Sequence, residues 1–258
     1  MAHRTLIGGT GYTVTGGTDL IDGTARSRTA GRTLVDGTAY AIGFGGLDAD
    51  CSKNSWRTII AACQNKQVPD TWNVGDSCMM AFGKKNYQID IIGKNHDDYA
   101  DGSGKAPLTF QMHTTYATQY KMNGAEYNNC GWKNCLVRTS NAFPALKKVM
   151  PAEVVAALKA VTKKTTAGGA SSAIDTTEDT LFLLSEIEVQ GTRTHSYAGE
   201  GTQYAYYQTA ANRKKNRAWY LRSPRISSTS CFCRTGWSGE ADWSVASEVD
   251  GIAAAWCF

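Results

Sequence analysis

Residues 74–92 read VGDSCMMAFGKKNYQIDII, and this stretch decides the fold of the larger part of the chain. Two runs rich in apolar side chains, Ser77 to Phe82 and Tyr87 to Ile92, are separated by Gly83, two lysines and Asn86. Short apolar runs on either side of a turn that contains Gly and Asn are typical of a β-hairpin. We therefore expect an antiparallel hairpin here.

Helical patterns lie on both sides of this hairpin. Before it, four apolar side chains recur with helical spacing: Trp56, Ile59, Ile60 and Cys63. After it, a helix is predicted from Pro151 to Lys164, because Pro suits the first helical position and an apolar stripe follows, formed by Val154, Val155, Leu158 and Val161. The small polar residues 165–177 predict a loop, and residues 181–184 predict a buried strand. Helices and hairpins in this mixture favour the α+β fold class.

Residues 1–46 contain a repeat, marked by Leu6, Leu20 and Leu34. Each copy places Gly-Gly or Asp-Gly between two short runs, and these dipeptides favour the tight turns of β-hairpins. Three short β-hairpins are therefore predicted. Hairpins of this size are marginal alone in water, so we interpret residues 1–46 as an attachment or oligomerisation module in front of a domain at 47–258. A decorative meander on the main domain is the alternative.

The composition is that of a globular protein. The 258 residues are 42% hydrophobic and 19% charged, which supports a core and argues against a disordered chain. The net charge of +4 and a pI near 8.6 are too mild for a typical nucleic-acid binder. No apolar run reaches the roughly 18 residues of a membrane span, and the first residues lack the apolar core of a secretory signal. We expect synthesis in the cytoplasm, no nucleic-acid partner and no membrane span.

Eight cysteines allow several interpretations. Cys130 and Cys135, and likewise Cys231 and Cys233, have spacings that fit a zinc site poorly. Disulfides are rare in a reducing cytosol. We therefore expect buried thiols that act as small apolar side chains, with a zinc site as the alternative.

Two charged segments also have two interpretations each. The carboxylates and imidazole between His96 and Asp101 could ligate a metal, but they lack the spacing of a calcium-binding loop, so a solvated loop with turn-capping carboxylates is favoured. Residues 213–217 read RKKNR and could contact a phosphate or an anionic glycan, although a solvated turn is favoured.

From Val74 to the C-terminus, several motifs in fixed order resemble the DUF6273 family of bacterial and prophage proteins. They are VGD at 74–76, IIGKNHDD at 91–98, LTF at 108–110, GW at 131–132, FLLSEIEV at 182–189, WYLRSP at 219–224 and GIAAAWCF at 251–258. The repeats in 1–46 also resemble those that precede such domains in prophage tail-region proteins. The chain departs from the family pattern at Ala254, where Pro is expected, and at Trp256, where Phe is expected.

The resemblance implies a C-type-lectin-like fold, related to that of formylglycine-generating enzymes. In that fold a small twisted sheet and two helices support a long, irregular C-terminal region that presents a ligand-binding surface. Some members of the family are variable proteins of diversity-generating retroelements. These elements mutate the C-terminal segment and so change what a phage or cell adheres to.

The candidate ligand-binding surface lies between the motifs at 219–224 and 251–258. The segment is rich in Ser and contains two Trp, a composition typical of paratopes. Phe232, Val245 and Val249 are expected to point inward, and Glu240 with Asp242 to form an acidic edge. The predicted ligand-binding residues are Arg225, Ile226, Ser228, Thr229, Ser230, Trp237, Ser238, Glu240, Asp242, Trp243, Ser247 and Glu248. An ordinary surface loop with partly buried tryptophans is the alternative.

The function expected from these observations is receptor binding by a phage or prophage adhesin, not catalysis. No Gly-x-Ser-x-Gly, His-Glu-x-x-His or phosphate-binding loop occurs. We expect a host cell-surface protein or glycan as ligand, no cofactor, and no calcium-dependent sugar site, because the Glu-Pro-Asn and Gln-Pro-Asp tripeptides are absent.

Residues 1–46 are expected to contact virion tail components and to form a homo-oligomer, a trimer as in tail fibres, in the virion. One alternative is a structural virion protein without its own ligand. The other is a copper oxidase like the formylglycine-generating enzymes, with thiols drawn from Cys231, Cys233 and Cys257.

Overall fold

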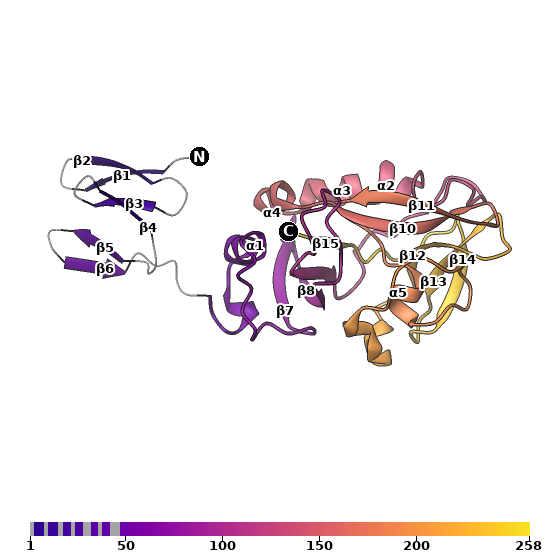
Figure 1. The fold of residues 1–258 in the computed structure, drawn as a ribbon. Coiled ribbons are helices and arrows are strands. Elements are labelled where there is room, and N and C mark those ends of the chain that lie inside the picture. The colour runs from indigo at the N-terminus through magenta and orange to yellow at the C-terminus, as the bar shows by residue number, and fades with distance from the viewer. Residues whose placement is uncertain are drawn as a thin grey trace. The chain divides into compact units, whose positions relative to one another are not determined.

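The computed structural model describes residues 47–258 and, before them, six short strands between residues 3 and 41 (Figure 1). The chain divides into two compact units, Met1–Asp48 and Ala49–Phe258. The first unit contains three antiparallel hairpins, as the repeat predicted. Their strands are β1 (His3–Ile7) with β2 (Thr10–Val14), β3 (Thr18–Ile21) with β4 (Thr24–Ser27), and β5 (Arg32–Val35) with β6 (Thr38–Ala41).

The larger unit is built on a four-stranded antiparallel sheet in the order β15-β9-β8-β7. Its strands are β7 (Ser77–Phe82), β8 (Lys85–Lys94), β9 (Leu108–Met112) and β15 (Ala255–Cys257). Strands β7 and β8 form the predicted hairpin, with Phe82 opposite Lys85. Strand β9 is buried along its whole length, and β15 pairs with it through Trp256 opposite Phe110. The end of the chain therefore completes the central sheet.

Helix α1 (Trp56–Gln64) confirms the first predicted helix. The helix begins at Ser55, whose hydroxyl oxygen accepts a hydrogen bond from the backbone N–H of Thr58 at 3.2 Å, as helix-capping residues do. Trp56 lies 5.5 Å from Phe110 and 6.2 Å from Phe258, measured between ring centroids. These edge-on contacts attach α1 to the central sheet.

The helix predicted from Pro151 to Lys164 is wrong beyond residue 157. Helix α4 spans Ala152–Ala157, and Val154 is its buried residue. The chain then forms an antiparallel hairpin of β10 (Val161–Gly168) and β11 (Ser171–Asp179), which replaces the loop predicted at 165–177. The burial of Val161, Lys163 and Thr165 follows the two-residue period of a strand.

Leu181–Leu184 is buried as expected but is not a strand of a sheet. Phe182 forms a single bridge with Ala255, which places this segment beside β15. The remaining helices are short. They are η1 (Cys51–Lys53), α2 (Leu136–Thr139), α3 (Ala142–Val149), α5 (Glu186–Gln190), η2 (Ala205–Gln208) and η3 (Ala210–Arg213).

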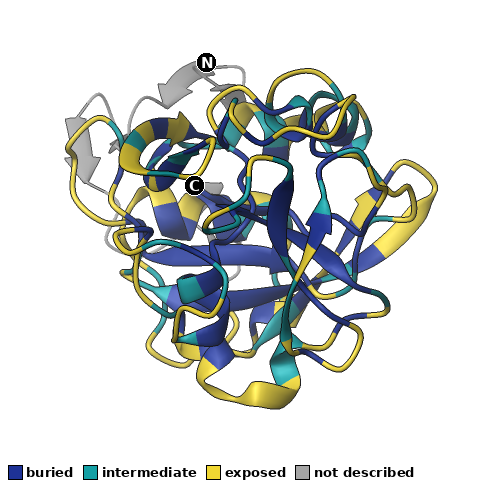
Figure 2. Cartoon of the chain, turned by 90° about the vertical axis from the view of Figure 1, so that its right-hand side faces the viewer, coloured by how far each residue is buried: buried dark blue, intermediate teal, exposed yellow. Residues whose placement is uncertain are grey.

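A second sheet lies at the opposite end of the larger unit from α1 and β7 (Figure 1). Its antiparallel strands are β12 (Trp219–Pro224), β13 (Cys231–Thr235) and β14 (Ala241–Val245), in that order. The two edge strands of this sheet differ, since β12 is fully buried whereas four of the five residues of β14 are half-buried or exposed. Exposed residues gather in the peripheral loops, and the strands near the centre are buried (Figure 2).

The architecture is therefore mixed α/β, with mostly antiparallel sheets and few helices. In the part of the chain that the structure describes, no helix is long and apolar enough to cross a membrane.

Candidate ligand-binding site

None of the twelve predicted surface residues is buried. Six are exposed: Thr229, Trp237, Ser238, Glu240, Trp243 and Glu248. The other six are half-buried: Arg225, Ile226, Ser228, Ser230, Asp242 and Ser247. The exposed fractions of Trp237 and Trp243 are 67% and 37%, which is unusual for so large an apolar side chain.

The three residues that were predicted to point inward differ in their burial. Phe232 is fully buried, and Val245 is half-buried. The prediction for Val249 is wrong, since 48% of this residue is exposed. The chain turns after β14, where the Glu248 N–H donates to the Val245 carbonyl at 3.0 Å. The buried residue after β14 is Ala246, whose N–H donates to the Ser230 carbonyl at 2.8 Å.

Trp237 lies on a tight turn between β13 and β14. The Gly236 N–H donates to the Glu240 carbonyl at 2.9 Å, and Gly239 has a φ of +95°, a conformation that favours glycine. The Glu240 carboxylate accepts from the N–H and the hydroxyl of Ser238, and these bonds lower the pKa of Glu240. The turn therefore presents the indole from a backbone that is held by its own hydrogen bonds.

Trp243 is stacked with a cation. The guanidinium carbon of Arg225 lies 4.1 Å from the centroid of its ring, within the range of a cation–π interaction. The Nε atom of Arg225 is buried and has no hydrogen-bond partner. Arg225 follows β12 and Trp243 lies on β14. Their stacking therefore connects the two edge strands of the second sheet at this surface.

One carboxylate of the expected acidic edge, Asp242, is paired with a cation, whereas Glu240 keeps its charge. The Asp242 carboxylate accepts from Arg234 Nε at 2.7 Å, and Arg234 Nη1 donates to Asp250 at 2.9 Å. Glu240 is engaged by Ser238. The surface therefore offers a ligand two indoles, one guanidinium, several hydroxyls and the exposed carboxylates of Glu240 and Glu248.

A buried ionic network lies elsewhere in the same unit. The Lys163 ammonium donates to Asp97, to Glu188 at 3.2 Å and to the Tyr204 hydroxyl at 2.8 Å. All four residues are nearly inaccessible to solvent. Burial alone would raise the pKa of Asp97, but the Lys163 ammonium holds it below its ordinary value. The prediction of a solvated loop is therefore wrong for Asp97.

Arg222 joins this network to the second sheet. Its guanidinium donates to both oxygens of Glu188, at 2.5 and 2.9 Å, and to the Thr165 hydroxyl at 2.9 Å. It also donates to the carbonyls of Leu183 and Glu200, both at 2.9 Å. All five donors of a guanidinium can be satisfied by this set. The pKa of Glu188, which burial would raise, is held low by Arg222 and Lys163.

Glu186 fixes the loop that borders the predicted surface. Its buried carboxylate accepts backbone N–H bonds from Thr194, His195 and Ser196, between 2.7 and 3.1 Å. The His195 carbonyl in turn accepts from the N–H of Ile226 at 2.6 Å. The backbone of the candidate ligand-binding segment is thus connected to α5.

A family model described as Domain of unknown function (DUF6273) matches residues 108–257. The chain belongs to this family. No curated protein and no solved structure matches the chain. The DUF6273 match includes Lys163, Glu188 and Arg222 together with the whole predicted ligand surface, whereas Asp97 precedes it.

The motifs that suggested DUF6273 converge in the network. Glu186 and Glu188 come from the motif at 182–189, and Arg222 with Ser223 from the motif at 219–224. All four are buried. Sequence reasoning found these motifs but missed that their polar residues form one core network, because no spacing along the chain links them.

Glu200 is a second buried carboxylate in the DUF6273 domain. It accepts from the N–H and the hydroxyl of Thr166, at 2.9 and 2.7 Å, and bonds with the Ser223 hydroxyl. Burial raises its pKa. Glu200 therefore differs from Glu188, which is paired with two cations.

The same substitution at Glu200 and at Glu188 should change the stability by different amounts. Glu200→Gln keeps an oxygen that accepts from Thr166, while the Ser223 hydroxyl must accept from the new amide instead of donating, and the free energy of unfolding should change by about 1 kcal/mol or less. Glu188→Gln leaves Arg222 without its counter-ion in the core and should cost about 3–5 kcal/mol at neutral pH. Chemical denaturation of both variants measures the two values. Equal losses would contradict the difference in electrostatic surroundings.

The pH dependence of the two variants should have opposite signs. The raised pKa of Glu200 gives wild type a stability that is present below the unfolded value of about 4.3 and is lost as pH rises. Glu200→Gln should therefore gain stability relative to wild type as the pH rises above that unfolded value. The lowered pKa of Glu188 gives stability above that value that is lost in acid, so the cost of Glu188→Gln should shrink as pH falls.

The thiols considered for copper lie in two different sheets. Cys231 and Cys233 are on β13, and Cys257 is on β15; all three are buried. Burial raises the pKa of Cys233 and of Cys257 far above the ordinary value, which favours the neutral thiol over the metal-binding thiolate. Seven of the eight cysteines are buried and all are free thiols, as expected of small apolar side chains. Within residues 47–258, no group of three or more His, Cys, Asp or Glu could hold a metal.

The basic segment 213–217 is not a simple solvated turn. Lys215 is buried, and its ammonium donates to the carbonyls of Met112 and His113 at 2.8 and 2.9 Å. Burial lowers the pKa of Lys215 to about 8. Arg213 donates to the Tyr207 carbonyl and to Gln190. Of the four cationic residues in this segment, Arg213 and Lys215 thus bind other parts of the fold.

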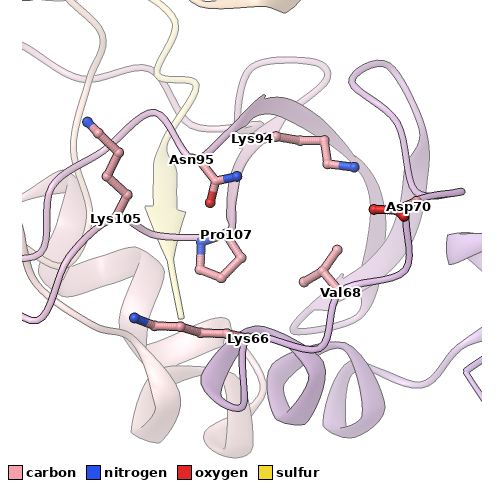
Figure 3. A pocket seen from close by; sticks show the side chains of 7 residues that line it. All are labelled: Lys66, Val68, Asp70, Lys94, Asn95, Lys105 and Pro107. Carbon is pink, nitrogen blue, oxygen red and sulfur yellow. The ribbon is translucent and has the colours of Figure 1, made fainter.

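A hollow of about 360 Å³ lies away from the second sheet and was missed by the sequence analysis (Figure 3). Its lining is Lys66, Val68, Asp70, Lys94, Asn95, Lys105 and Pro107. Lys94 donates to the Trp72 carbonyl at 2.8 Å, and Lys105 pairs with Asp98 at 3.0 Å. Lys66, Lys94 and Lys105 come from three separate segments of the chain, so no sequence motif indicates this hollow.

Proposed function

We propose that the protein is a receptor-binding protein, or adhesin, of a phage or prophage. Its DUF6273 domain would have a C-type-lectin-like fold, with the segment between β12 and β15 as a variable ligand surface. The observation that carries the proposal is the pair of exposed indoles, Trp237 and Trp243, on the β13–β14 hairpin. Exposed tryptophans are enriched at binding hot spots.

The separation of buried motif residues from exposed surface residues within the domain supports this proposal. The family motifs at 182–189 and 219–224 supply buried carboxylates and a buried guanidinium to the core. The segment between Pro224 and Gly251 supplies side chains that the core does not use, such as Trp237 and Thr229. A scaffold with buried motifs and an exchangeable surface is the layout that a diversity-generating retroelement requires.

The chemistry of the surface indicates the class of ligand. Two indoles and the stacked Arg225 provide flat apolar area beside a positive charge. The hydroxyls of Ser228, Thr229 and Ser238 can donate to or accept from a hydroxyl-rich partner. A host surface glycan or a host surface protein fits this combination.

Binding to intact cells tests the proposal. Fluorescently labelled full-length protein would be incubated with a panel of bacterial strains and measured by flow cytometry. Saturable binding to some strains and not to others is expected. Absence of binding to every strain, for a protein that is nevertheless found in virions, would favour the structural virion protein instead.

The neighbouring DNA gives an independent test of diversification. A reverse-transcriptase gene and an imperfect copy of the coding sequence for the last part of the chain are expected nearby. If the copy differs from the gene at the codons of the predicted surface residues, diversification is supported. A locus without either element would contradict that part of the proposal.

The full chain is expected to self-associate. The three N-terminal hairpins are two-stranded sheets, which are marginal alone in water. They are therefore expected to contact other copies of the chain, giving a symmetric homo-oligomer, a trimer as in tail fibres. Multi-angle light scattering at micromolar concentration measures the mass. A monomer would contradict the prediction.

A further inference from the structure

Two cysteine side chains at the start of the larger unit are in direct contact. Cys51 lies in η1 and Cys78 in β7, and their sulfur atoms are 2.8 Å apart. Both residues are buried. A disulfide bond is about 2.05 Å long, so a small approach of the two sulfurs would join them. Within residues 47–258, this is the one pair of thiols that is joined by a hydrogen bond.

We propose that Cys51 and Cys78 are a site of oxidative modification, at which a peroxide converts the two thiols into a disulfide. One thiolate attacks a peroxide oxygen, the O–O bond breaks, and a sulfenic acid and water form. The second sulfur then attacks the sulfenic sulfur, the S–O bond breaks, and a second water leaves. The two sulfurs lose two electrons in total, and hydrogen peroxide gains them.

The burial of the two thiols favours a small oxidant. The hydrogen bond to Cys78 and burial both raise the pKa of Cys51, so that the reactive thiolate is scarce. Peroxide is small enough to reach buried thiols, unlike bulky disulfides. Burial also raises the pKa of neighbouring Cys63 to about 12, so the contact between the two sulfurs, and not their acidity, distinguishes Cys51 and Cys78 from Cys63.

The position of the pair gives the cross-link a structural consequence. Cys51 comes three residues after Asp48, the last residue of the first unit. Strand β7 is one of the two edge strands of the central sheet. The disulfide would bind the beginning of the larger unit to that sheet across a separation of 27 residues. This inference does not depend on the proposed function.

Peptide mapping of the full chain tests the proposal. After peroxide treatment, digestion without reductant should yield one linked peptide pair containing Cys51 and Cys78. Titration of the denatured protein should fall from eight free thiols to six, because two are consumed. The melting temperature should rise by roughly 5–10 °C and return after reduction, as loop closure in the unfolded chain predicts.

Two serine variants separate this pair from its neighbour. Cys63→Ser, also at a buried position in α1, should retain the cross-link, and Cys51→Ser should lose it. A linked peptide that contains Cys63, a sulfinic acid at Cys51 without a link, or eight remaining thiols would overturn the proposal. The wild-type map decides the matter even if Cys51→Ser fails to fold.

Discussion

Arg222→Met should lower the melting temperature of the protein by roughly 6–20 °C. Removing one partner of a buried ion pair costs about 3–5 kcal/mol, and in a domain of this size each kcal/mol shifts the melting temperature by about 2–4 °C. The variant leaves Glu188 buried with Lys163 as its remaining cation. It also removes donors from the carbonyls of Leu183 and Glu200. Differential scanning calorimetry measures the shift.

Arg234→Met is the matched control for this prediction. Arg234 also binds two carboxylates, Asp242 and Asp250, but it is half-buried, so water can replace part of its interactions. We expect a loss of about 1 kcal/mol or less. The double variant Arg222→Met, Glu188→Leu should recover part of the loss, because no buried charge is then left unpaired. Equal shifts for Arg222→Met and Arg234→Met would show that the network does not stabilise the core as described.

Replacing Trp237 and Trp243 together by Ala should abolish adhesion to any strain that the wild-type protein binds. Truncation of a hot-spot tryptophan costs about 2 kcal/mol or more, so two such losses weaken binding by roughly a thousandfold if they add. The melting temperature should change little for Trp237, which is 67% exposed. It should fall slightly for Trp243, which loses its stacking with Arg225.

Two further variants make this result interpretable. Met79→Ala removes an apolar side chain that is 59% exposed on β7, far along the chain from the predicted surface, and should leave adhesion unchanged. Trp243→Phe keeps an aromatic ring beside Arg225 and should retain part of the binding. Unfolding of the double Ala variant would show that the tryptophans belong to the core, and normal adhesion would place the site elsewhere.

The elements that could be predicted from the sequence are those with a strong local pattern. The hairpin of β7 and β8 has a clear turn, and α1 has a capping serine before an apolar face. The hairpin of β10 and β11 was missed because its strands are built largely from Thr, Ser and Lys, whose polarity suggested a loop. Lys163 shows why the burial of this strand could not be predicted locally. Its ammonium is buried on β10 because Asp97 and Glu188, which are far away in sequence, neutralise its charge.

The candidate surface could be predicted as a segment but not in its internal pairing. Apolar and polar residues between two framework motifs were enough to suggest which side chains reach solvent. The pairing of Asp242 with Arg234 depends on the register of β13 against β14, which places these two residues opposite each other. Likewise Val249 was assigned inward by its apolarity, whereas the turn after β14 decides that Ala246 is buried instead.

The turn between β13 and β14 has a consequence for protein engineering. Strands β13 and β14 pair through backbone groups, so amino acids at their outward positions can be exchanged without removing the ladder. A combinatorial library that randomises Trp237, Trp243 and Thr229 while keeping Glu240 and Asp242 should yield mostly folded members. The side chains of the first three make no hydrogen bond to the turn in the described structure, whereas those of the last two bind Ser238 and Arg234. The domain would then serve as a display scaffold whose specificity can be selected independently of its folding.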